Sequence, residues 1–155
     1  MTPPNTSTDQ ICKQLRLQSP QSRVWRAISD SAEFGAWFGI KIDGLFAVGS
    51  ELAAVSTNGE CSGVGFDLLI ERIDPETDFA FRWKPSTSEP GRDVSKDPTT
   101  LVHFRLESID GGTKLTVTES GFDAFPEELR ATFFQRNEGG WAHQIEAIRK
   151  YCDDA

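Results

Sequence analysis

The sequence WAHQIEAIRKYC at residues 141–152 decides the fold of this chain. Its apolar side chains recur at i, i+4, i+7 and i+11, so they share one face of an α-helix: Trp141, Ile145, Ile148 and Cys152. Upstream, Pro126 and the acidic pair Glu127-Glu128 are typical of a helix start, since acidic side chains favour the positive end of the helix dipole. We therefore expect one long amphipathic helix. At Gly139-Gly140 this helix is expected either to break or to pack very close to another element.

The segments before this helix show the alternation of half-buried strands. Phe79, Phe81 and Trp83 alternate with Ala80 and Arg82, which predicts a strand with an aromatic inner face. Similar alternation occurs elsewhere, at residues 64–70, 102–106 and 115–119. Turn sequences separate these segments: Asn58-Gly59, residues 74–78 and Asp110-Gly111-Gly112. Because short connections usually join neighbouring strands, we expect an antiparallel meander.

The start of the domain combines a short strand with two short helices. Apolar residues mark the strand: Ile11, Leu15 and Leu17. Ser19-Pro20 predicts a first helix in which Ser19 is the cap and Pro20 the first helical residue. Asp30, followed three residues later by Glu33, predicts a second capped helix. Its aromatic side chains share one face: Phe34, Trp37 and Phe38.

Together these patterns predict an α+β fold. We expect a flexible tail at residues 1–9 and a single domain at residues 10–155. The domain should contain a curved antiparallel sheet of about six strands wrapped around the long C-terminal helix, with the two short helices after the first strand.

Composition limits the class of partner and the compartment. The net charge of −8 repels phosphate backbones and anionic lipid, so nucleic acid is not an expected partner. No apolar run approaches the roughly 20 residues that span a bilayer, and the N-terminus lacks the pattern of a signal peptide. Three distant cysteines build neither a disulfide framework nor a metal motif: Cys12, Cys61 and Cys152. These features predict a cytoplasmic protein.

No catalytic or metal-binding pattern is convincing. Residues 59–63 match G-x-C-x-G around Cys61, but a strand follows them where a nucleophile elbow needs a helix. His103 is out of phase with the inner face of its strand, and His143 is off the apolar stripe of the long helix. Both histidines are therefore expected at the surface. The sequence predicts no catalytic residue, metal or cofactor, and it favours a protein that is not an enzyme.

Glu119 is the polar residue of most interest. It follows Leu115 and Val117 on the same face of its strand, so alternation points its carboxylate inward. Burial of a carboxylate is costly unless it is paired. Arg72 and Arg82 are candidate partners, although Arg82 should point outward. Two interpretations stay open: a solvated residue at the rim of the sheet, or a polar anchor or acid/base group at a pocket. By contrast, Asp153-Asp154 at the end of the chain is expected to be solvated surface.

The order of these elements resembles the START/SRPBCC superfamily, in particular the branch named after the activator of heat-shock-protein ATPase. The matching segments, in chain order, are Ser19-Pro20, Val24-Trp25, residues 34–38, 70–76, 81–83, 112–117 and 119–122, and Gly140-Trp141. This resemblance implies the helix-grip fold. It also implies a hollow between the long helix and the sheet, often occupied by an apolar molecule.

The aromatic side chains expected around that hollow either line a cavity or fill it, and both interpretations stay open. The predicted ligand-binding residues are Trp37, Phe38, Phe66, Phe81, Trp83, Phe104, Glu119, Trp141 and Ile145. The first hypothesis is a domain that binds a small hydrophobic or amphipathic molecule. The alternatives are a co-chaperone-like module with a protein partner, and a cyclase- or hydrolase-type enzyme that uses the same pocket.

Overall fold

The computed structural model describes residues 9–57, 63–88 and 93–153. Within these residues, seven strands form one sheet and three α-helices accompany it. In chain order the elements are β1 (Gln10–Leu17), α1 (Gln21–Ser29), α2 (Ser31–Phe38), β2 (Ile40–Ile42), β3 (Glu51–Ser56), β4 (Gly65–Asp74), β5 (Asp78–Trp83), η2 (Pro85–Ser88), β6 (Thr100–Ile109), β7 (Gly112–Ser120), η3 (Phe122–Ala124) and α3 (Glu127–Asp153).

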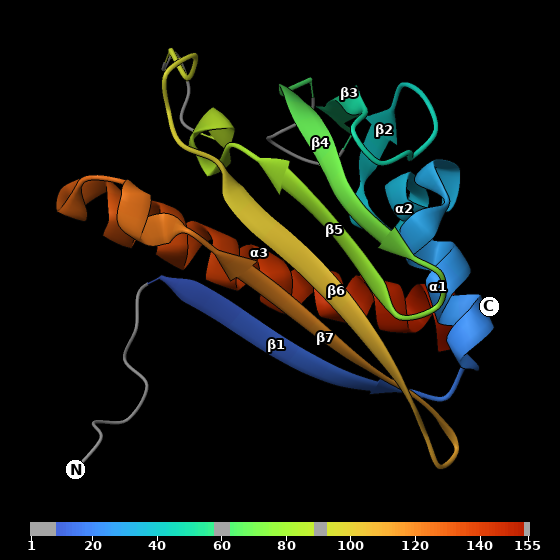
Figure 1. Cartoon of the computed structure of the whole chain (residues 1–155). Coiled ribbons are helices and arrows are strands. Elements are labelled where there is room, and N and C mark those ends of the chain that lie inside the picture. The colour runs from blue at the N-terminus through green and yellow to red at the C-terminus, as the bar shows by residue number, and fades with distance from the viewer. Residues whose placement is uncertain (1–8, 58–62, 89–92, 154–155) are drawn as a thin grey trace, which may run out of the picture.

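The sheet is antiparallel throughout, and its strand order is β1-β7-β6-β5-β4-β3-β2. Figure 1 shows α3 crossing one face of the curved sheet, with α1 and α2 at the end where α3 finishes. This arrangement confirms the predicted α+β helix-grip fold. The short edge strand β2 was not predicted, because three residues are too few to show an alternating pattern.

The predicted inner face of the sheet is confirmed. Phe81 on β5 pairs with Val102 on β6, and Val102 pairs with Glu119 on β7, so these three residues form one row across the sheet. The side chains of Phe81 and Val102 are fully buried. Arg82, the next residue along β5, points outward and forms an ion pair with Glu71 at 2.7 Å.

The two predicted helix starts have different outcomes. Asp30 caps α2 as expected, since its carboxylate accepts the backbone N–H of Ala32 and Glu33. The predicted cap of α1 is wrong: Pro20, in an extended conformation, occupies the N-cap position without a side-chain cap, and the helix begins at Gln21. The Ser19 hydroxyl instead lies at the end of α3.

Ser19 and Asp153 hold the end of α3 against the start of α1. The Asp153 carboxylate accepts the backbone N–H of Gln18 at 3.0 Å and of Ser19 at 3.1 Å. The Ser19 hydroxyl lies 2.7 Å from Asp153 Oδ1 and 2.8 Å from the Cys152 carbonyl oxygen. The prediction that Asp153 is merely solvated surface is therefore wrong, while Asp154 lies outside the described residues.

The glycine pair in α3 does not have either predicted effect. The helix continues without a break from Glu127 to Asp153. A Cβ atom added at Gly139 or at Gly140 would meet nothing within 4 Å, so neither glycine permits a close approach. Both glycines are exposed on the helix surface.

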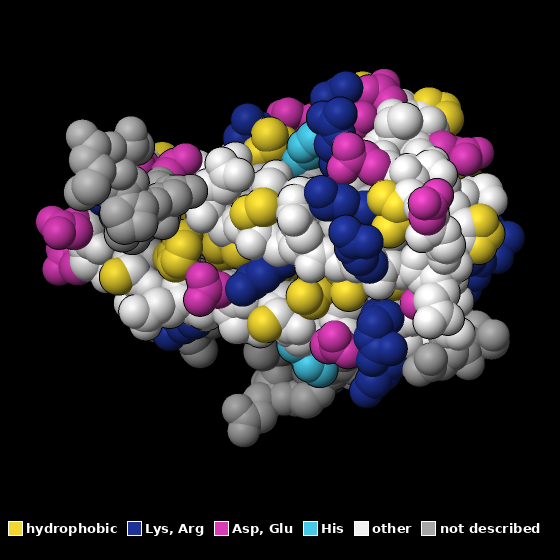
Figure 2. Space-filling model, turned by 90° about the horizontal axis from the view of Figure 1, so that it is seen from below, with side chains coloured by type: hydrophobic (Ala, Val, Ile, Leu, Met, Phe, Trp, Pro, Cys, Tyr) yellow, Lys and Arg dark blue, Asp and Glu magenta, His cyan; other side chains and the backbone are white. Residues whose placement is uncertain are grey.

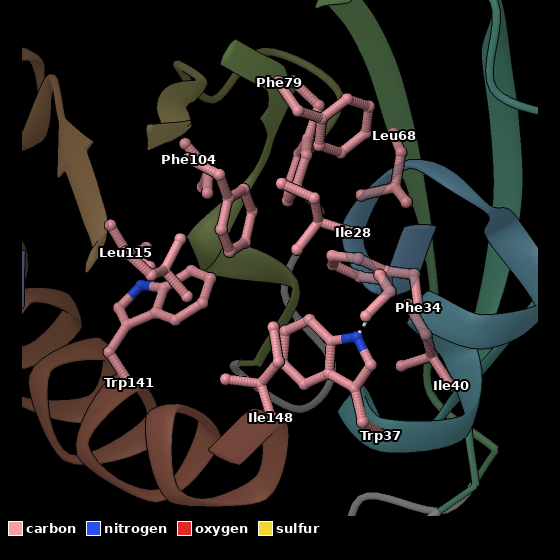
Figure 3. Close-up of a cluster of buried hydrophobic side chains, with 14 of the residues drawn as sticks. Ile28, Phe34, Trp37, Ile40, Leu68, Phe79, Phe104, Leu115, Trp141 and Ile148 are labelled. Carbon is pink, nitrogen blue, oxygen red and sulfur yellow. Dashed lines mark hydrogen bonds between the residues drawn. The ribbon is translucent and has the colours of Figure 1, made fainter. Parts of the chain in front are cut away.

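Closely packed aromatic rings occupy the space between α3 and the sheet. The ring of Phe34 lies 4.9 Å from that of Trp37, 6.1 Å from Phe81 and 6.0 Å from Phe104. Trp141 reaches from α3 towards Phe104 and Leu115 on the sheet (Figure 3), with a ring distance of 5.8 Å to Phe104. Phe34, Phe81 and Phe104 have no accessible surface. A void large enough for a water molecule would give the rings that border it some accessible surface. Rings therefore fill the centre of the domain.

The molecular surface mixes both signs of charge. Figure 2 shows Lys and Arg side chains among Asp and Glu side chains, with hydrophobic side chains in separate small areas between them. The net charge of −8 thus does not produce a single-sign surface on this face. Among the described residues, no helix is long and apolar enough to cross a membrane.

Candidate ligand-binding site

Glu119 lies at the centre of a buried hydrogen-bond network. Its side chain is fully buried, so the interpretation as a solvated residue at the rim is wrong. Oε2 accepts the indole N–H of Trp83 at 2.7 Å and the hydroxyl of Thr100 at 2.5 Å. Oε1 accepts the indole N–H of Trp141 at 2.8 Å, and the amide nitrogen of Asn137 lies 2.9 and 3.0 Å from the two oxygens.

The donors around Glu119 are brought together by the sheet register and the helix period. Trp83 on β5 pairs with Thr100 on β6, and both belong to the inner face beside Glu119. Asn137 and Trp141 are four residues apart on α3, so they share the helix face that covers the sheet. A buried carboxylate is tolerated when its oxygens are well hydrogen-bonded, and here neutral donors supply those bonds.

The predicted arginine partners are elsewhere. Arg72 forms ion pairs with Asp74 and Asp78, and Arg82 pairs with Glu71. Both oxygens of Glu119 are already occupied by donors that keep it in place. The geometry therefore fits a residue that holds its neighbours in position. It fits a free acid or base less well.

An open pocket of about 340 Å³ lies beside this network, where one end of the inner sheet face meets α2 and α3. Six apolar residues contribute to its wall: Phe38, Ile40, Val64, Phe66, Trp83 and Pro85. Polar side chains from α3 form the opposite wall: Asn137, His143 and Gln144. An apolar pocket of this size with a few convergent polar groups is typical of small-molecule sites.

The predicted ligand-binding residues fall into distinct places. Phe38, Phe66 and Trp83 line the pocket. Four others lie in the packed core and not in the pocket wall: Trp37, Phe81, Phe104 and Trp141. Glu119 lies behind the wall and contacts the pocket through Trp83 and Asn137, whereas Ile145 is half-buried on α3 without lining the pocket.

Asn137 and Gln144 were missed by the sequence reasoning. Asn137 precedes Trp141 by one helical turn, and Gln144 follows Trp141 by three residues. Both therefore border the apolar stripe of α3. A polar amide next to an otherwise apolar stripe was the available indication that part of this helix faces a polar feature.

A second hollow, of about 740 Å³, lies on the outer face of the sheet. Outward-facing charged residues contribute much of its wall: Glu51, Asp67, Arg82, Lys84 and Asp93. In its wall, the Lys84 ammonium group donates to the carbonyl oxygens of Val94 and Ser95 at 2.8 and 3.1 Å. This hollow is larger, but the five charged residues in its wall make it less suited to an apolar ligand than the pocket beside Glu119.

The two histidines do not form a metal site. His143 is exposed at the pocket, and His103 is half-exposed on the outer face, 2.6 Å from the carboxylate of Asp78. Burial acts to raise the pKa of Asp78, but the hydrogen bonds from His103 and Thr77 and the charge of Arg72 lower it below its usual value.

In the parts of the chain that the structure describes, no group of three His, Cys, Asp or Glu side chains could hold a metal ion. Cys61 and most of its glycine-flanked motif lie outside those parts.

Comparison with solved structures supports the fold. The chain is similar to protein MLL2253 from Mesorhizobium loti, with a TM-score of 0.72 and 20% identity over 92% of this chain and 95% of that one. It is also similar to protein Ms6760 from Mycobacterium smegmatis, with a TM-score of 0.74 and 16% identity over 96% and 93% of the two chains. The Aha1 dimer from Colwellia psychrerythraea gives a TM-score of 0.70 and 17% identity over 93% and 96%.

No curated protein matches the chain. The family model described as Activator of Hsp90 ATPase homolog 1-like protein, however, matches residues 18–153, which is most of the sequence. This match confirms the resemblance to that branch of the START/SRPBCC superfamily. The chain therefore belongs to the Activator of Hsp90 ATPase homolog 1-like protein family.

Proposed function

We propose that this protein binds a small hydrophobic or amphipathic molecule in the pocket between the sheet and α3. The observation that carries the proposal is the open pocket of about 340 Å³ with an aromatic wall formed by Phe38, Phe66 and Trp83. Aromatic faces bury large apolar areas, and the pocket is within the size range of drug-sized ligand sites. The cysteine spacing supports a cytoplasmic location as part of the same proposal.

The hydrogen-bond network behind the pocket supports a preformed site. Trp83 is fixed by its bond to Glu119, and its ring lies 5.9 Å from those of Phe38 and Phe66. Asn137 on the opposite wall is fixed by the same carboxylate. A ligand would therefore meet side chains that have already lost most of their freedom, which lowers the entropic cost of binding.

Titration with N-phenyl-1-naphthylamine, a neutral apolar dye that fluoresces in apolar sites, tests this proposal. His143→Trp fills the pocket from the exposed face of α3, so we expect it to weaken dye binding at least tenfold. Ala142→Trp is the matched control, because Ala142 is exposed on the same helix and does not line the pocket. Ala53→Trp fills the hollow on the outer face instead. Loss of binding in Ala53→Trp but not in His143→Trp would contradict the proposed site.

A second candidate function, a co-chaperone-like interaction module, is supported by an exposed apolar segment. Leu45 and Val48, between β2 and β3, are 81% and 62% exposed. Exposed apolar residues close together can mark a protein contact. If this segment contacts an Hsp90-type chaperone, the chain should change that chaperone's ATPase rate, and the double variant Leu45→Ser, Val48→Ser should abolish the change. An unchanged ATPase rate with the wild-type chain would remove this candidate.

A further inference from the structure

Three aromatic rings meet at steep angles in the wall of the pocket beside Glu119. The ring of Trp83, on β5, lies 5.9 Å from that of Phe38, on α2, and 5.9 Å from that of Phe66, on β4. The planes of the two phenyl rings are inclined to the indole plane by 62° and 77°. All three side chains line the pocket, and each is half-buried. The rings therefore form corners in the pocket wall and not one flat surface.

These corners have the dimensions of a cation site. The face of an aromatic ring is negative, and it attracts a cation that lies within about 6 Å of the ring centroid. Where two ring faces meet near a right angle with centroids 5.9 Å apart, a cation in the corner lies about 4 Å from both centroids. Phe34 stacks on one face of Phe38 at a ring distance of 5.0 Å, so the other face of Phe38 is the one that a ligand can contact. Such groups of rings bind methylated ammonium ions.

The charge behind this wall has the sign that favours a cation. The hydrogen bonds to the two oxygens of Glu119 come from neutral donors, on Trp83, Thr100, Asn137 and Trp141. Within the described residues, no Lys, Arg or His side chain pairs with this carboxylate. Its negative charge lies 2.7 Å from the indole nitrogen of Trp83 and attracts a cation held in front of that ring. The net charge of −8 adds to this attraction.

The other polar groups of the wall favour a cation without N–H groups. Lys84 also lines the pocket, but its ammonium group donates to the carbonyl oxygens of Val94 and Ser95, which line the outer-face hollow and not this pocket. No acidic side chain is part of the described pocket wall. A primary ammonium group loses a hydrogen bond to water for each N–H that finds no acceptor, whereas a quaternary ammonium group has no N–H to satisfy.

We infer that the ligand of this pocket carries a quaternary ammonium group on an apolar body, and that Phe38, Phe66 and Trp83 hold this group by cation–π attraction. This inference rests on the proposed ligand-binding function. It adds the chemical class of the polar end of an amphipathic ligand. A carboxylate or phosphate end is disfavoured, because it would face negative ring surfaces with the Glu119 carboxylate behind them.

Phenyltrimethylammonium and tert-butylbenzene test the inference, because they have the same shape and differ in charge. Each is titrated into the full chain loaded with N-phenyl-1-naphthylamine, and displacement of the dye gives its affinity. We expect phenyltrimethylammonium to bind at least about threefold more tightly, as cation–π contacts allow. Equal affinities, tighter binding of tert-butylbenzene, or no displacement by the ammonium ion would overturn the inference while dye binding keeps the pocket. If the dye itself does not bind, the proposed function fails, and the inference fails with it.

Phe66→Leu removes one ring and keeps the wall apolar. In this variant the preference for phenyltrimethylammonium over tert-butylbenzene should fall at least about twofold, while the affinity for tert-butylbenzene stays within about twofold of wild type. Val64→Ala, which trims a non-aromatic side chain of the same wall, is the matched control and should keep the preference. An undiminished preference in Phe66→Leu would overturn the cation–π contact. If thermal unfolding shows that Phe66→Leu does not fold, the two probes on the wild-type chain still decide whether the pocket prefers a cation.

Discussion

Trp141 donates its indole N–H to Oε1 of Glu119 over 2.8 Å, and this bond joins α3 to the inner face of β7. The other oxygen of the same carboxylate accepts the indole N–H of Trp83 on β5. With the hydroxyl of Thr100 on β6 as a further donor, one buried carboxylate thus connects the long helix to three strands of the sheet. Trp83 and Asn137, which it also holds, stand on opposite walls of the pocket. The stability of the domain and the shape of the pocket therefore depend on the same residue.

Glu119→Gln should destabilise the domain. The new amide group places N–H atoms where indole and hydroxyl donors already point, so buried donors lose their acceptor. We expect the free energy of unfolding to fall by about 1–3 kcal/mol in urea titrations. Glu107→Gln, on the exposed face of β6, is the control and should change it by less than about 0.5 kcal/mol. Equal effects of the two substitutions would show that the network does not stabilise the fold.

Replacing either exposed glycine of α3 by alanine should stabilise the domain. Gly139→Ala and Gly140→Ala should each raise the free energy of unfolding by about 0.5–1 kcal/mol, because alanine loses less backbone freedom in a helix and nothing obstructs its Cβ. Gly35→Ala in α2 provides the contrast, since its Cβ would collide with the carbonyl oxygen of Ile40. That substitution should cost about 1–3 kcal/mol. Thermal and urea unfolding of the three variants would check the signs, and a loss of stability at Gly139 or Gly140 would contradict the open environment of these residues.

Acid should weaken the contact between α3 and α1. Burial acts to raise the pKa of Asp153, but hydrogen bonds from the backbone N–H of Gln18 and from Ser19 outweigh it and hold that pKa below its usual value. A carboxyl group with a lowered pKa in the folded state stabilises the fold above its unfolded pKa, and this contribution disappears as the pH falls through the folded pKa.

The stability difference between wild type and Asp153→Asn should therefore be constant above about pH 5 and shrink below about pH 4. Urea titrations across this range measure it. Asp110→Asn, in the exposed turn between β6 and β7, serves as the control substitution. A difference that grows on acidification would have the wrong sign for this account.

Cys12 and Cys152 should differ strongly in reactivity. Burial raises the pKa of Cys152 to about 11, whereas Cys12 is exposed on β1. Thiol reagents attack the thiolate, so at mildly alkaline pH the Cys152 side chain should react only after unfolding. In a Cys61→Ser background, Ellman's reagent should show one fast phase that Cys12→Ser removes. A fast phase that survives this second substitution would mean that Cys152 is accessible in the folded protein.

The strand faces were predictable because alternation is a local property. Phe81, Val102 and Glu119 each obey it within their own strands, and hydrogen-bond register then aligns them in one row. The partners of Glu119 were not predictable in the same way. Trp83, Asn137 and Trp141 are far from it in the sequence, and only the packing of α3 on the sheet brings them together.

The failed predictions have similar causes. Ser19 is a residue type that often caps helices, but here its hydroxyl donates to the Asp153 carboxylate instead. Gly139-Gly140 suggested a break or a close approach, yet the long helix tolerates both glycines because its other residues pack against the sheet. Local patterns therefore identified the elements and their faces, whereas the pocket wall and its polar groups depend on contacts between distant segments.

The central claim, that the protein binds a small molecule between α3 and the sheet, is tested most directly by intermolecular NOEs to bound N-phenyl-1-naphthylamine in the isotope-labelled wild-type chain. The account predicts NOEs from the dye protons to Ile40, to Val64 and to the ring of Phe38 at the pocket. NOEs to Ala53 and Leu69 on the outer face of the sheet, or saturable binding that gives no NOE to the pocket, would contradict it.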